Sequence, residues 1–374
     1  MDTDADVLVV GAGPAGGSAA YFLKQFGYKV LIVDKQSLPR YKPCGGGVPL
    51  KALNNFSFNP QSVIEDHIST ITFAYQQKHI SIPVKSNALA MTMRDKLDSY
   101  IVEDSGADVV EKEKICSLGY AGKKIELSTE SGRKLKANYV VAADGAYSRI
   151  AQLAGLRKNK HMGVALELEA DVSPAVMHSY RSRMLIGTGS LPWGYYWIFP
   201  KSDHLSVGIG SFRNKAKGLL GLFKQTLNEL EINFADNQIK AHPLPYYSGR
   251  QCLTKDKILL CGDAAGLVDP LTGEGIQHAI TSGKLAAQAI ATQRIDSYDR
   301  QIEENFSRNL NWAKVLAYVM YNYTPVSFHW LIRNKYFVAD FFRIVAQKQQ
   351  YKNILAKLPL YFALFWKRLP LEEK

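Results

Sequence analysis

The sequence predicts an α/β protein in which a largely parallel sheet carries an inserted antiparallel-sheet domain and leads into a helical C-terminal region. Three observations support this prediction. A strand, a glycine turn, a helix and a second strand open the chain; apolar and aromatic strand-like segments recur between about residues 162 and 210; and the pattern is largely helical from about residue 274 onward. Alternating strands and helices favour a parallel sheet, whereas consecutive strands favour an antiparallel one.

The opening unit covers residues 5–33. Residues 5–10 form an apolar run too short for a helix, which predicts a buried parallel strand. Small residues introduce a helical pattern over residues 14–26, and residues 29–33 repeat the pattern of a buried strand. Together they predict a βαβ unit of the length that a dinucleotide-binding motif requires.

The same criteria predict the later elements. A helix is expected over residues 94–105, and strands are expected at residues 71–83, 125–128, 134–143, 162–168, 195–199, 205–209 and 258–261. We assign residues 1–60, 90–150 and 250–300 to a discontinuous nucleotide-binding domain, residues 61–89 and 151–249 to a substrate-binding domain, and residues 301–374 to the C-terminal helical region.

Composition limits the class of protein. With 374 residues, of which 47% are hydrophobic and 21% charged, the chain is expected to fold and to bury a large cofactor. Its four cysteines lie far apart with no CxxC pair, so neither a metal site nor a disulfide framework is predicted. A reducing cytoplasmic location fits, because the first residues also lack the features of a secretory signal.

The net charge of +12 is concentrated near the end of the chain. Residues 312–368 hold nine Lys or Arg and a single acid, Asp340, together with many aromatic residues. Basic and aromatic residues together suggest peripheral contact with the anionic inner face of a membrane. A packed helical tail with a solvated basic face explains the same pattern, and no nucleic-acid-binding motif accompanies it. Apolar runs are too short for a spanning helix.

A glycine motif lies between the first predicted strand and helix. Gly11, Gly13 and Gly16 form a GxGxxG element, and Asp34 ends the second strand. The glycines allow a tight turn, approach of the backbone to a pyrophosphate and close packing of helix on strand. Asp34 is expected to accept a hydrogen bond from a ribose hydroxyl. The motif alone does not distinguish FAD from NAD, and a glycine-rich turn without a ligand is the alternative.

A second element lies far downstream. Residues 261–270 read CGDAAGLVDP after a buried strand, and residues 272–276 read TGEGI at the start of a helix. Together with the AADG at residues 142–145, they resemble the glutathione-reductase-type fold shared by aromatic hydroxylases and geranylgeranyl reductases. The resemblance implies a Rossmann-like FAD-binding fold, with Asp263 on the ribityl chain and the N-terminus of the downstream helix at the flavin. The cofactor-binding residues that it implies are Gly11, Gly13, Ala15, Gly16, Asp34, Lys35, Arg94, Asp144, Gly262, Asp263, Gly273, Gly275 and Ile276. For Arg94, a surface position on its helix is the alternative.

Two further segments narrow the resemblance to the geranylgeranyl reductase family. Residues 42–49, KPCGGGVP, resemble its KPCG segment, and residues 192–200, PWGYYWIFP, resemble its prenyl-binding PxxYxWxFP pattern. The resemblance implies Cys44 and Gly45 as catalytic residues. It implies a substrate wall made of Pro192, Tyr195, Trp197 and Phe199. The last three alternate along a strand and share one face, which plain core packing would also explain. The resemblance extends to about residue 300.

The resemblance implies an FAD-dependent reductase that hydrogenates C=C bonds of a geranylgeranyl or similar polyprenyl chain. An isolated alkene needs a proton as well as a hydride, and Cys44 is the expected donor; tight packing beside the flavin is its alternative role. Because no second nucleotide motif is present, electrons are expected from NADPH or a reduced carrier. An FAD monooxygenase or halogenase on the same fold, and a non-catalytic prenyl-lipid carrier, are the competing functions.

Overall fold

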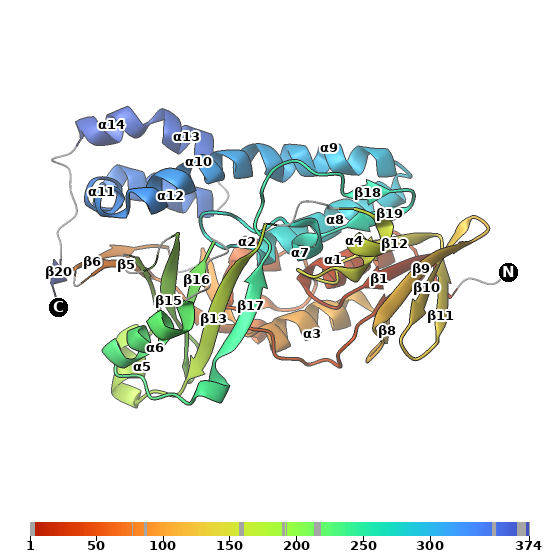
Figure 1. Ribbon diagram of the computed structural model, residues 1–374, viewed down its shortest axis with the longest axis horizontal. Coiled ribbons are helices and arrows are strands. Elements are labelled where there is room, and N and C mark those ends of the chain that lie inside the picture. Colours follow the sequence, from red (N-terminus) through yellow and green to blue (C-terminus); the bar gives the residue numbers. More distant parts are fainter. Residues whose placement is uncertain are drawn as a thin grey trace.

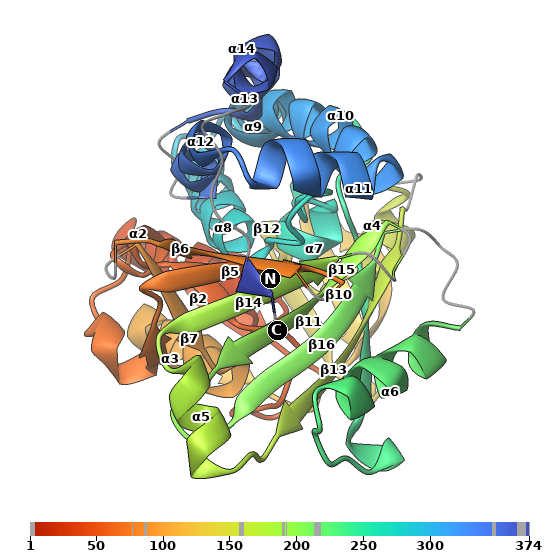
Figure 2. The ribbon, with the colours of Figure 1, turned by 90° about the vertical axis from the view of Figure 1, so that its left-hand side faces the viewer.

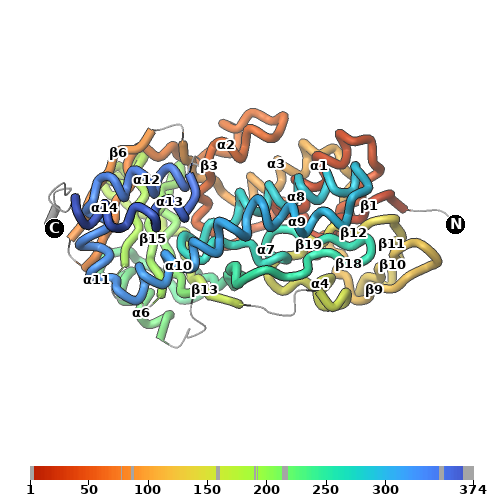
Figure 3. Tube along the Cα trace, turned by 90° about the horizontal axis from the view of Figure 1, so that it is seen from above, coloured from red at the N-terminus to blue at the C-terminus, as the bar shows by residue number. Residues whose placement is uncertain are grey.

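The computed structural model describes residues 4–76, 78–85, 88–156, 161–188, 191, 193–212, 218–345, 349–364 and 372–373. The molecule is elongated (Figure 1). A parallel sheet lies toward one end, a large mixed sheet toward the other, and the C-terminal helices cover the large sheet from above, as Figure 3 also shows. This arrangement confirms the predicted fold class.

A six-stranded sheet in the order β18-β19-β12-β1-β2-β8 forms the nucleotide-binding core. Its strands are β1 (Val7–Val10), β2 (Val30–Val33), β8 (Asp108–Val110), β12 (Tyr139–Ala142), β19 (Ile258–Leu260) and the antiparallel β18 (Thr254–Lys255). The central strands β1, β2, β12 and β19 are short runs of mostly apolar residues, because strands at the centre of a covered parallel sheet are buried on both faces. The helices associated with this region are α1 (Pro14–Gln25), α3 (Arg94–Ser105), α4 (Arg149–Ala154), α7 (Gly262–Ala265) and α8 (Ile276–Ala291).

Two small antiparallel sheets flank this core. One has the order β11-β10-β9, with β9 (Ile115–Ala121), β10 (Lys124–Thr129) and β11 (Lys134–Ala137); the other has the order β3-β7-β4, with β3 (Gly47–Pro49), β4 (Ile64–His67) and β7 (Leu89–Thr92). The single strand predicted over residues 134–143 is therefore wrong. The chain breaks at Asn138, because β11 pairs with β10 whereas β12 continues into the parallel sheet. Between and beside these strands lie α2 (Leu50–Leu53) and η1 (Pro60–Val63).

An eight-stranded sheet carries the aromatic segments. Its order is β17-β13-β16-β15-β14-β5-β6-β20, with β5 (Thr70–Tyr75), β6 (Lys78–Pro83), β13 (Gly163–Ala170), β14 (Arg183–Thr188), β15 (Gly194–Pro200), β16 (Leu205–Ser211), β17 (Lys240–Leu244) and β20 (Glu372–Glu373). Neighbouring strands are antiparallel except β5 and β14. Helices α5 (Pro174–Tyr180) and α6 (Leu219–Glu229) lie beneath the sheet (Figure 2), with η2 (Asp236–Gln238) leading into β17. An apolar cluster including Leu168, Ile198 and Phe223 fills that side, so the opposite face is left for the site.

The C-terminal helices form the upper layer (Figure 2). They follow η3 (Ile295–Ser297), α9 (Tyr298–Ile302) and η4 (Glu303–Ser307), and comprise α10 (Arg308–Asn322), α11 (Thr324–Ser327), η5 (Phe328–Ile332), α12 (Lys335–Val345), α13 (Tyr351–Ala356) and α14 (Leu358–Ala363). Buried Leu316, Phe337 and Tyr361 pack this layer together. Among the described residues, no helix is long and apolar enough to cross a membrane.

Candidate active site

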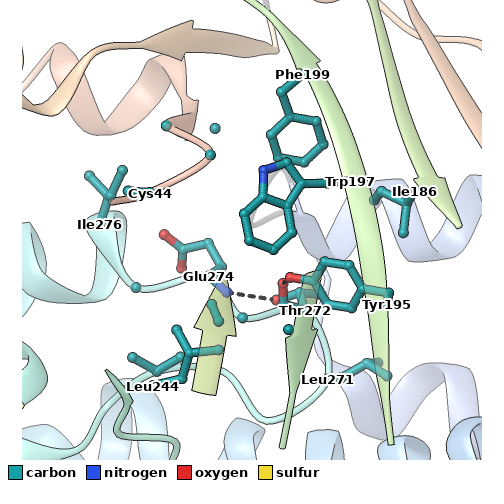
Figure 4. A pocket seen from close by; sticks show the side chains of 18 of the residues that line it. Cys44, Ile186, Tyr195, Trp197, Phe199, Leu244, Leu271, Thr272, Glu274 and Ile276 are labelled. Atoms are coloured by element: carbon teal, nitrogen blue, oxygen red, sulfur yellow. Dashed lines mark hydrogen bonds between the residues drawn. The ribbon is translucent and has the colours of Figure 1, made fainter. Parts of the chain in front are cut away.

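A cavity of about 310 Å³ lies where the parallel sheet, the large sheet and the C-terminal helices meet. Its wall combines the glycine turn at Gly13, the loop around Cys44, the strand residue Trp197, the loop ending at Ile276, and Phe328 from the upper helices. In Figure 4, Cys44 and Ile276 lie on one side of the cavity. Tyr195, Trp197 and Phe199, which we call the aromatic column, lie on the other. Segments distant in sequence thus share one largely apolar space.

The glycine motif has the geometry that the sequence predicts. Gly11 has φ of +105°, and a Cβ there would lie 2.3 Å from the carbonyl oxygen of Ala143. Asp34 stabilises the turn, since its Oδ2 accepts a hydrogen bond from the Ala12 amide at 2.6 Å and its Oδ1 accepts one from the Gln36 amide at 2.8 Å. The predicted ribose contact of Asp34 remains a prediction.

Four further residues predicted to bind the cofactor, Ala15, Gly16, Lys35 and Asp144, differ in burial and in hydrogen bonding. A Cβ on Gly16 would lie 1.8 Å from the Gly11 carbonyl oxygen, so helix α1 can approach β1 only with glycine there. Ala15 is buried and lines the cavity, whereas Lys35 is exposed. Asp144 caps helix α4, because its Oδ2 accepts hydrogen bonds from the amides at residues 149 and 150; its buried Oδ1 has no hydrogen-bond partner among the described residues.

Arg94 is buried, so the alternative of a surface helix residue is wrong. Its guanidinium donates two hydrogen bonds of 2.8 Å to Asp98, which also accepts one of 3.0 Å from Arg40. Two guanidiniums on one carboxylate leave an excess positive charge. Both lie within 4 Å of the point where a Cβ of Gly13 would be. A cationic, side-chain-free turn at the start of a helix fits the pyrophosphate of a dinucleotide.

Asp263 lies at the start of α7, beside the cavity. Its Oδ2 is 3.4 Å from the ammonium nitrogen of Lys42. Burial alone would raise the pKa of Asp263, but the positive charges of Lys42 and Arg94 outweigh burial and lower it. Burial, reinforced by Lys42, lowers the pKa of His242 to about 4, so this imidazole is neutral at physiological pH. Asp263 is therefore an ionised acceptor suited to the hydroxyls of a ribityl chain.

Three tyrosines hold the loop that precedes helix α8. Tyr195 donates to the carbonyl of Thr272, and Tyr321 donates to the carbonyl of Leu271. Tyr351 donates a 2.8 Å hydrogen bond to Oδ2 of Asp269, whose Oδ1 accepts from the backbone amides of Leu271 and Thr272. These tyrosines come from the large sheet and from two C-terminal helices, so two layers hold a loop that belongs to the third.

The loop delivers the start of helix α8 to the cavity. Gly273 has φ of +70°, and Gly275 is the N-cap residue that precedes Ile276. A Cβ on Gly262 would lie 2.9 Å from the Cβ of Ala15, so α7 also packs closely on the glycine motif. Gly273, Gly275 and Ile276 all line the cavity. A helix N-terminus aimed there favours the negative charge of a reduced flavin.

The loop of residues 44–47, which we call the Cys44 loop, packs directly on the aromatic column. A Cβ on Gly45 would lie 2.7 Å from Cδ2 of Phe199 and 3.0 Å from Nε1 of Trp197. The buried ammonium of Lys201 donates hydrogen bonds of 2.8 Å to the Gly45 carbonyl and 3.0 Å to the Thr92 carbonyl. Cys44 is a free thiol that lines the cavity. Glycine at position 45 thus permits the close approach that brings Cys44 to the cavity.

The aromatic column confirms the prediction that Tyr195, Trp197 and Phe199 share one face of a strand. Ring centroids of Tyr195 and Trp197, and of Trp197 and Phe199, are each 6.2 Å apart, and all three residues line the cavity (Figure 4). Opposite Trp197 on β16 is Gly208, which leaves room for the indole. Pro192 lies outside the described residues. The role of the column in binding substrate remains a prediction.

Some site residues were not predicted from the sequence. Lys201 continues the alternation of the aromatic column by two residues, and Glu167 faces the cavity from β13, an apolar strand apart from Glu167 and Glu169. Both positions break a hydrophobic pattern at the right spacing, which was a usable signal. His242, Tyr321 and Tyr351 offered no local signal, because their roles depend on contacts with distant segments.

Comparisons with known proteins agree with this geometry. Residues 5–190 match the family described as pyridine nucleotide-disulphide oxidoreductase. The chain is 31% identical over 308 residues to geranylgeranyl diphosphate reductase of Synechocystis, covering 76% of this chain and 74% of the relative. It is 30% identical over 358 residues to digeranylgeranylglycerophospholipid reductase of Thermoplasma acidophilum, covering 82% and 86% respectively.

Solved structures give the same result. A geranylgeranyl bacteriochlorophyll reductase-like protein of Thermoplasma acidophilum superimposes with a TM-score of 0.78 at 25% identity, covering 96% of this chain and 99% of the other. A flavin-dependent brominase superimposes with a TM-score of 0.71 at 16% identity, covering 96% and 99%, which shows a shared fold alone. The chain therefore belongs to the geranylgeranyl reductase family of flavin-dependent oxidoreductases.

Proposed function

We propose that the protein is an FAD-dependent reductase that hydrogenates carbon–carbon double bonds in a geranylgeranyl or similar polyprenyl chain. The observation that carries the proposal is the apolar cavity between the Cys44 loop and the aromatic column. Beyond the column the cavity is lined by apolar residues of β5, β14 and the upper helices: Ile71, Phe73, Met184, Ile186, Phe328, Ile332, Phe341 and Phe342. A long hydrocarbon chain can bury its surface there.

The dinucleotide would lie along the glycine motif. The guanidiniums of Arg40 and Arg94 would hold its pyrophosphate, and Asp263 would accept hydrogen bonds from its ribityl hydroxyls. When bound and reduced, FAD supplies a hydride to one carbon of the double bond. The 269–275 loop would hold the ring beside the cavity.

The remaining step needs a proton at the neighbouring carbon, and we assign it to the Cys44 thiol. Gly45 brings this thiol to the cavity wall, while Trp197 and Phe199 exclude water from the space that the alkene would occupy. Lys201 fixes the loop by holding the Gly45 carbonyl. Electrons would come from NADPH or a reduced carrier that docks transiently.

An anaerobic turnover experiment tests the proposal. The protein is loaded with FAD, reduced with dithionite, and mixed with geranylgeranyl diphosphate or with a geranylgeranyl glycerophospholipid. The expected result is oxidation of the flavin without oxygen, with products two hydrogens heavier per step by mass spectrometry. Flavin that stays reduced with both compounds until air enters would overturn the proposal and favour an oxygenase.

Cys44→Ser separates the roles of the cysteine. This variant should keep FAD and lose about 10²-fold or more of its rate, as expected for loss of a general acid. Cys252→Ser, at an exposed cysteine outside the cavity, is the matched control. Full activity in Cys44→Ser would show that the thiol only packs beside the cofactor.

We further propose that the C-terminal helices dock on an anionic bilayer. Their surface exposes large apolar side chains: Trp312, Val315, Tyr318, Tyr323, Val326, Tyr336, Leu360 and Phe362. These accompany the basic residues counted in the sequence, a combination suited to an anionic lipid surface.

Co-sedimentation with phosphatidylglycerol vesicles at low salt should decrease in the double variant Tyr318→Ser/Tyr323→Ser. It should not change in Tyr120→Ser, which is equally exposed on β9. Equal binding by all three proteins would contradict this docking.

A further inference from the structure

A line of carboxylates runs along the cavity-facing side of strand β13. Side chains alternate along a strand, so Ala165, Glu167 and Glu169 share one face, whereas Leu166 and Leu168 pack in the apolar cluster below the sheet. Ala165 and Glu167 line the cavity. The polar face of this strand therefore begins inside the site.

Glu167 is the member of this line that lines the cavity. It is 1% exposed, and its Oε1 accepts a 2.8 Å hydrogen bond from the Ser206 hydroxyl. Its Oε2 is buried and makes no hydrogen bond within the described part of the chain. A buried carboxyl oxygen without a donor is costly when charged, so the arrangement favours the protonated acid.

The outer end of the line reaches solvent. Nε2 of His204 lies 3.1 Å from Oε2 of Glu169, and its Nδ1 lies 2.7 Å from Oδ1 of Asp203. The Asp203 side chain is 83% exposed. The Glu169 carboxylate, more than any other neighbour, raises the pKa of His204 against the effect of partial burial. A proton-binding imidazole thus connects bulk water to the carboxylates.

The inner end of the line reaches the Cys44 loop. Tyr41 lies three residues before Cys44, and its side chain is 43% exposed. Partial burial first, and then the charges of Glu167 and Glu169, raise its pKa. Lys201 faces the same group from the end of β15. Burial lowers the pKa of Lys201, and the charges of Glu169 and Glu167 oppose that effect. Lys201 donates a hydrogen bond to the Gly45 carbonyl, which holds the Cys44 loop.

The protonation state supports a donor role for Glu167. Burial first, and then the charge of Glu169, raise its pKa to about 8. At neutral pH the acid therefore holds its proton, and it releases that proton only when a stronger base appears nearby. The proposed step leaves a thiolate on Cys44, which lines the same cavity as Glu167.

We propose that Glu167, supplied through Glu169 and His204, delivers the solvent proton that each alkene reduction consumes. The inference deepens the proposed function and rests on it. In each reduction the π bond breaks, one carbon gains a hydride with its electron pair from the reduced flavin, and the other carbon gains the proton of the Cys44 thiol. The thiolate regains a proton from Glu167, by way of the Tyr41 hydroxyl, and Glu167 regains one from Glu169 and His204. Reduced flavin and water supply all atoms and electrons.

The test is anaerobic stopped-flow oxidation of the reduced enzyme over repeated turnovers, across pH 6 to 10. Glu167→Gln keeps an acceptor for Ser206 but carries no exchangeable acid proton. We expect normal FAD content and normal reduction by dithionite, and turnover about 10²-fold slower with the fall above pH about 8 abolished. Glu65→Gln is the matched control, since Glu65 is a buried carboxyl that is already paired with Lys96 at 2.7 Å and does not line the cavity. Its pH profile should equal that of the wild type.

Two further measurements keep the proposal falsifiable if Glu167→Gln folds poorly. His204→Gln at the surface end should slow turnover, and added imidazole should restore the rate. In the FAD-free protein, the raised pKa of Glu167 means that its contribution to stability is complete below about pH 4 and is lost as pH rises through about 8. The thermal stability of Glu167→Gln relative to wild type should therefore increase over that interval.

The outcomes separate the two proposals. If the wild type oxidises with a prenyl compound but Glu167→Gln and His204→Gln share its rate and pH profile, the proton path is wrong and the reductase function stands. If the wild type is not oxidised by any prenyl compound, the function is wrong and the path falls with it.

Discussion

Gly208→Ala is the substitution that most directly tests whether the aromatic column bounds the substrate. Gly208 lies opposite Trp197, and a Cβ there would be 2.1 Å from Cζ2 of the indole. Ordinary contact begins at 3.4 Å, so the ring must move by the difference, about 1.3 Å. The strand neighbours Tyr195 and Phe199 flank the ring, which leaves the cavity as the open direction.

The size of the effect follows from this displacement. Overpacking of this kind costs about 1–3 kcal/mol of folding stability. A ring that advances into the cavity excludes about two CH₂ groups of a bound chain, at about 0.8 kcal/mol each, which corresponds to a roughly tenfold increase in KM. FAD content should not change, because the cofactor-binding residues lie on other segments.

The control is Gly210→Ala, on the same strand and the same face. Its Cβ would meet its nearest neighbours at 3.6 to 3.8 Å, which is ordinary contact. Thermal unfolding should show wild-type stability for this variant, and steady-state kinetics with the prenyl substrate should show a KM changed far less than in Gly208→Ala, although Gly210 lines the cavity. A wild-type KM in Gly208→Ala, or equal impairment of the two variants, would refute the reasoning that the indole forms the cavity wall.

Two other substitutions probe the cofactor site and the upper layer. Arg94→Leu leaves the buried carboxylate of Asp98 with one cation fewer and should lower the amount of FAD retained on purification, measured by absorbance. Lys96→Leu, at an exposed position on the same helix, should retain FAD. Equal retention by the two variants would contradict the anion-binding role of Arg94. Tyr351→Phe removes the hydroxyl that donates to Asp269, which should cost about 1–3 kcal/mol of unfolding free energy in the holoprotein, and an unchanged thermal transition would show that the carboxylate finds another donor.

The fold was predictable where the sequence carries local patterns. The first βαβ unit follows from two buried apolar runs and glycines whose spacing leaves little alternative, since a side chain at Gly11 or Gly16 would collide with backbone. The break at Asn138 was not predictable in the same way. Residues on both sides of it favour strands, and only pairing with different sheets separates them.

The site was predictable in part for the same reason. Cys44 and the aromatic column belong to segments with strong family resemblance, and both line the cavity. Lys201 holds the Cys44 loop and Glu167 accepts from Ser206, both through long-range contacts, and a buried charge in a predicted strand does not indicate its partner. Such residues emerge only when strands are placed in register.

The register of the large sheet also explains how one surface serves two purposes. The side chains of β15 that line the cavity are Tyr195, Trp197 and Phe199; Lys201 follows just beyond the strand at the same spacing, and β13 carries Glu167. Aromatic residues at one end can bury a hydrocarbon, whereas charged residues at the other end can exchange protons with water. Reduction of an isolated alkene needs both properties within a few ångströms of each other. The Cys44 loop packs on Phe199 and is held by Lys201. Cys44, the proposed acid, therefore lies at the boundary between the aromatic end and the charged end. A one-residue insertion in β15 would therefore turn the aromatic side chains away from the cavity and separate Lys201 from the Gly45 carbonyl together.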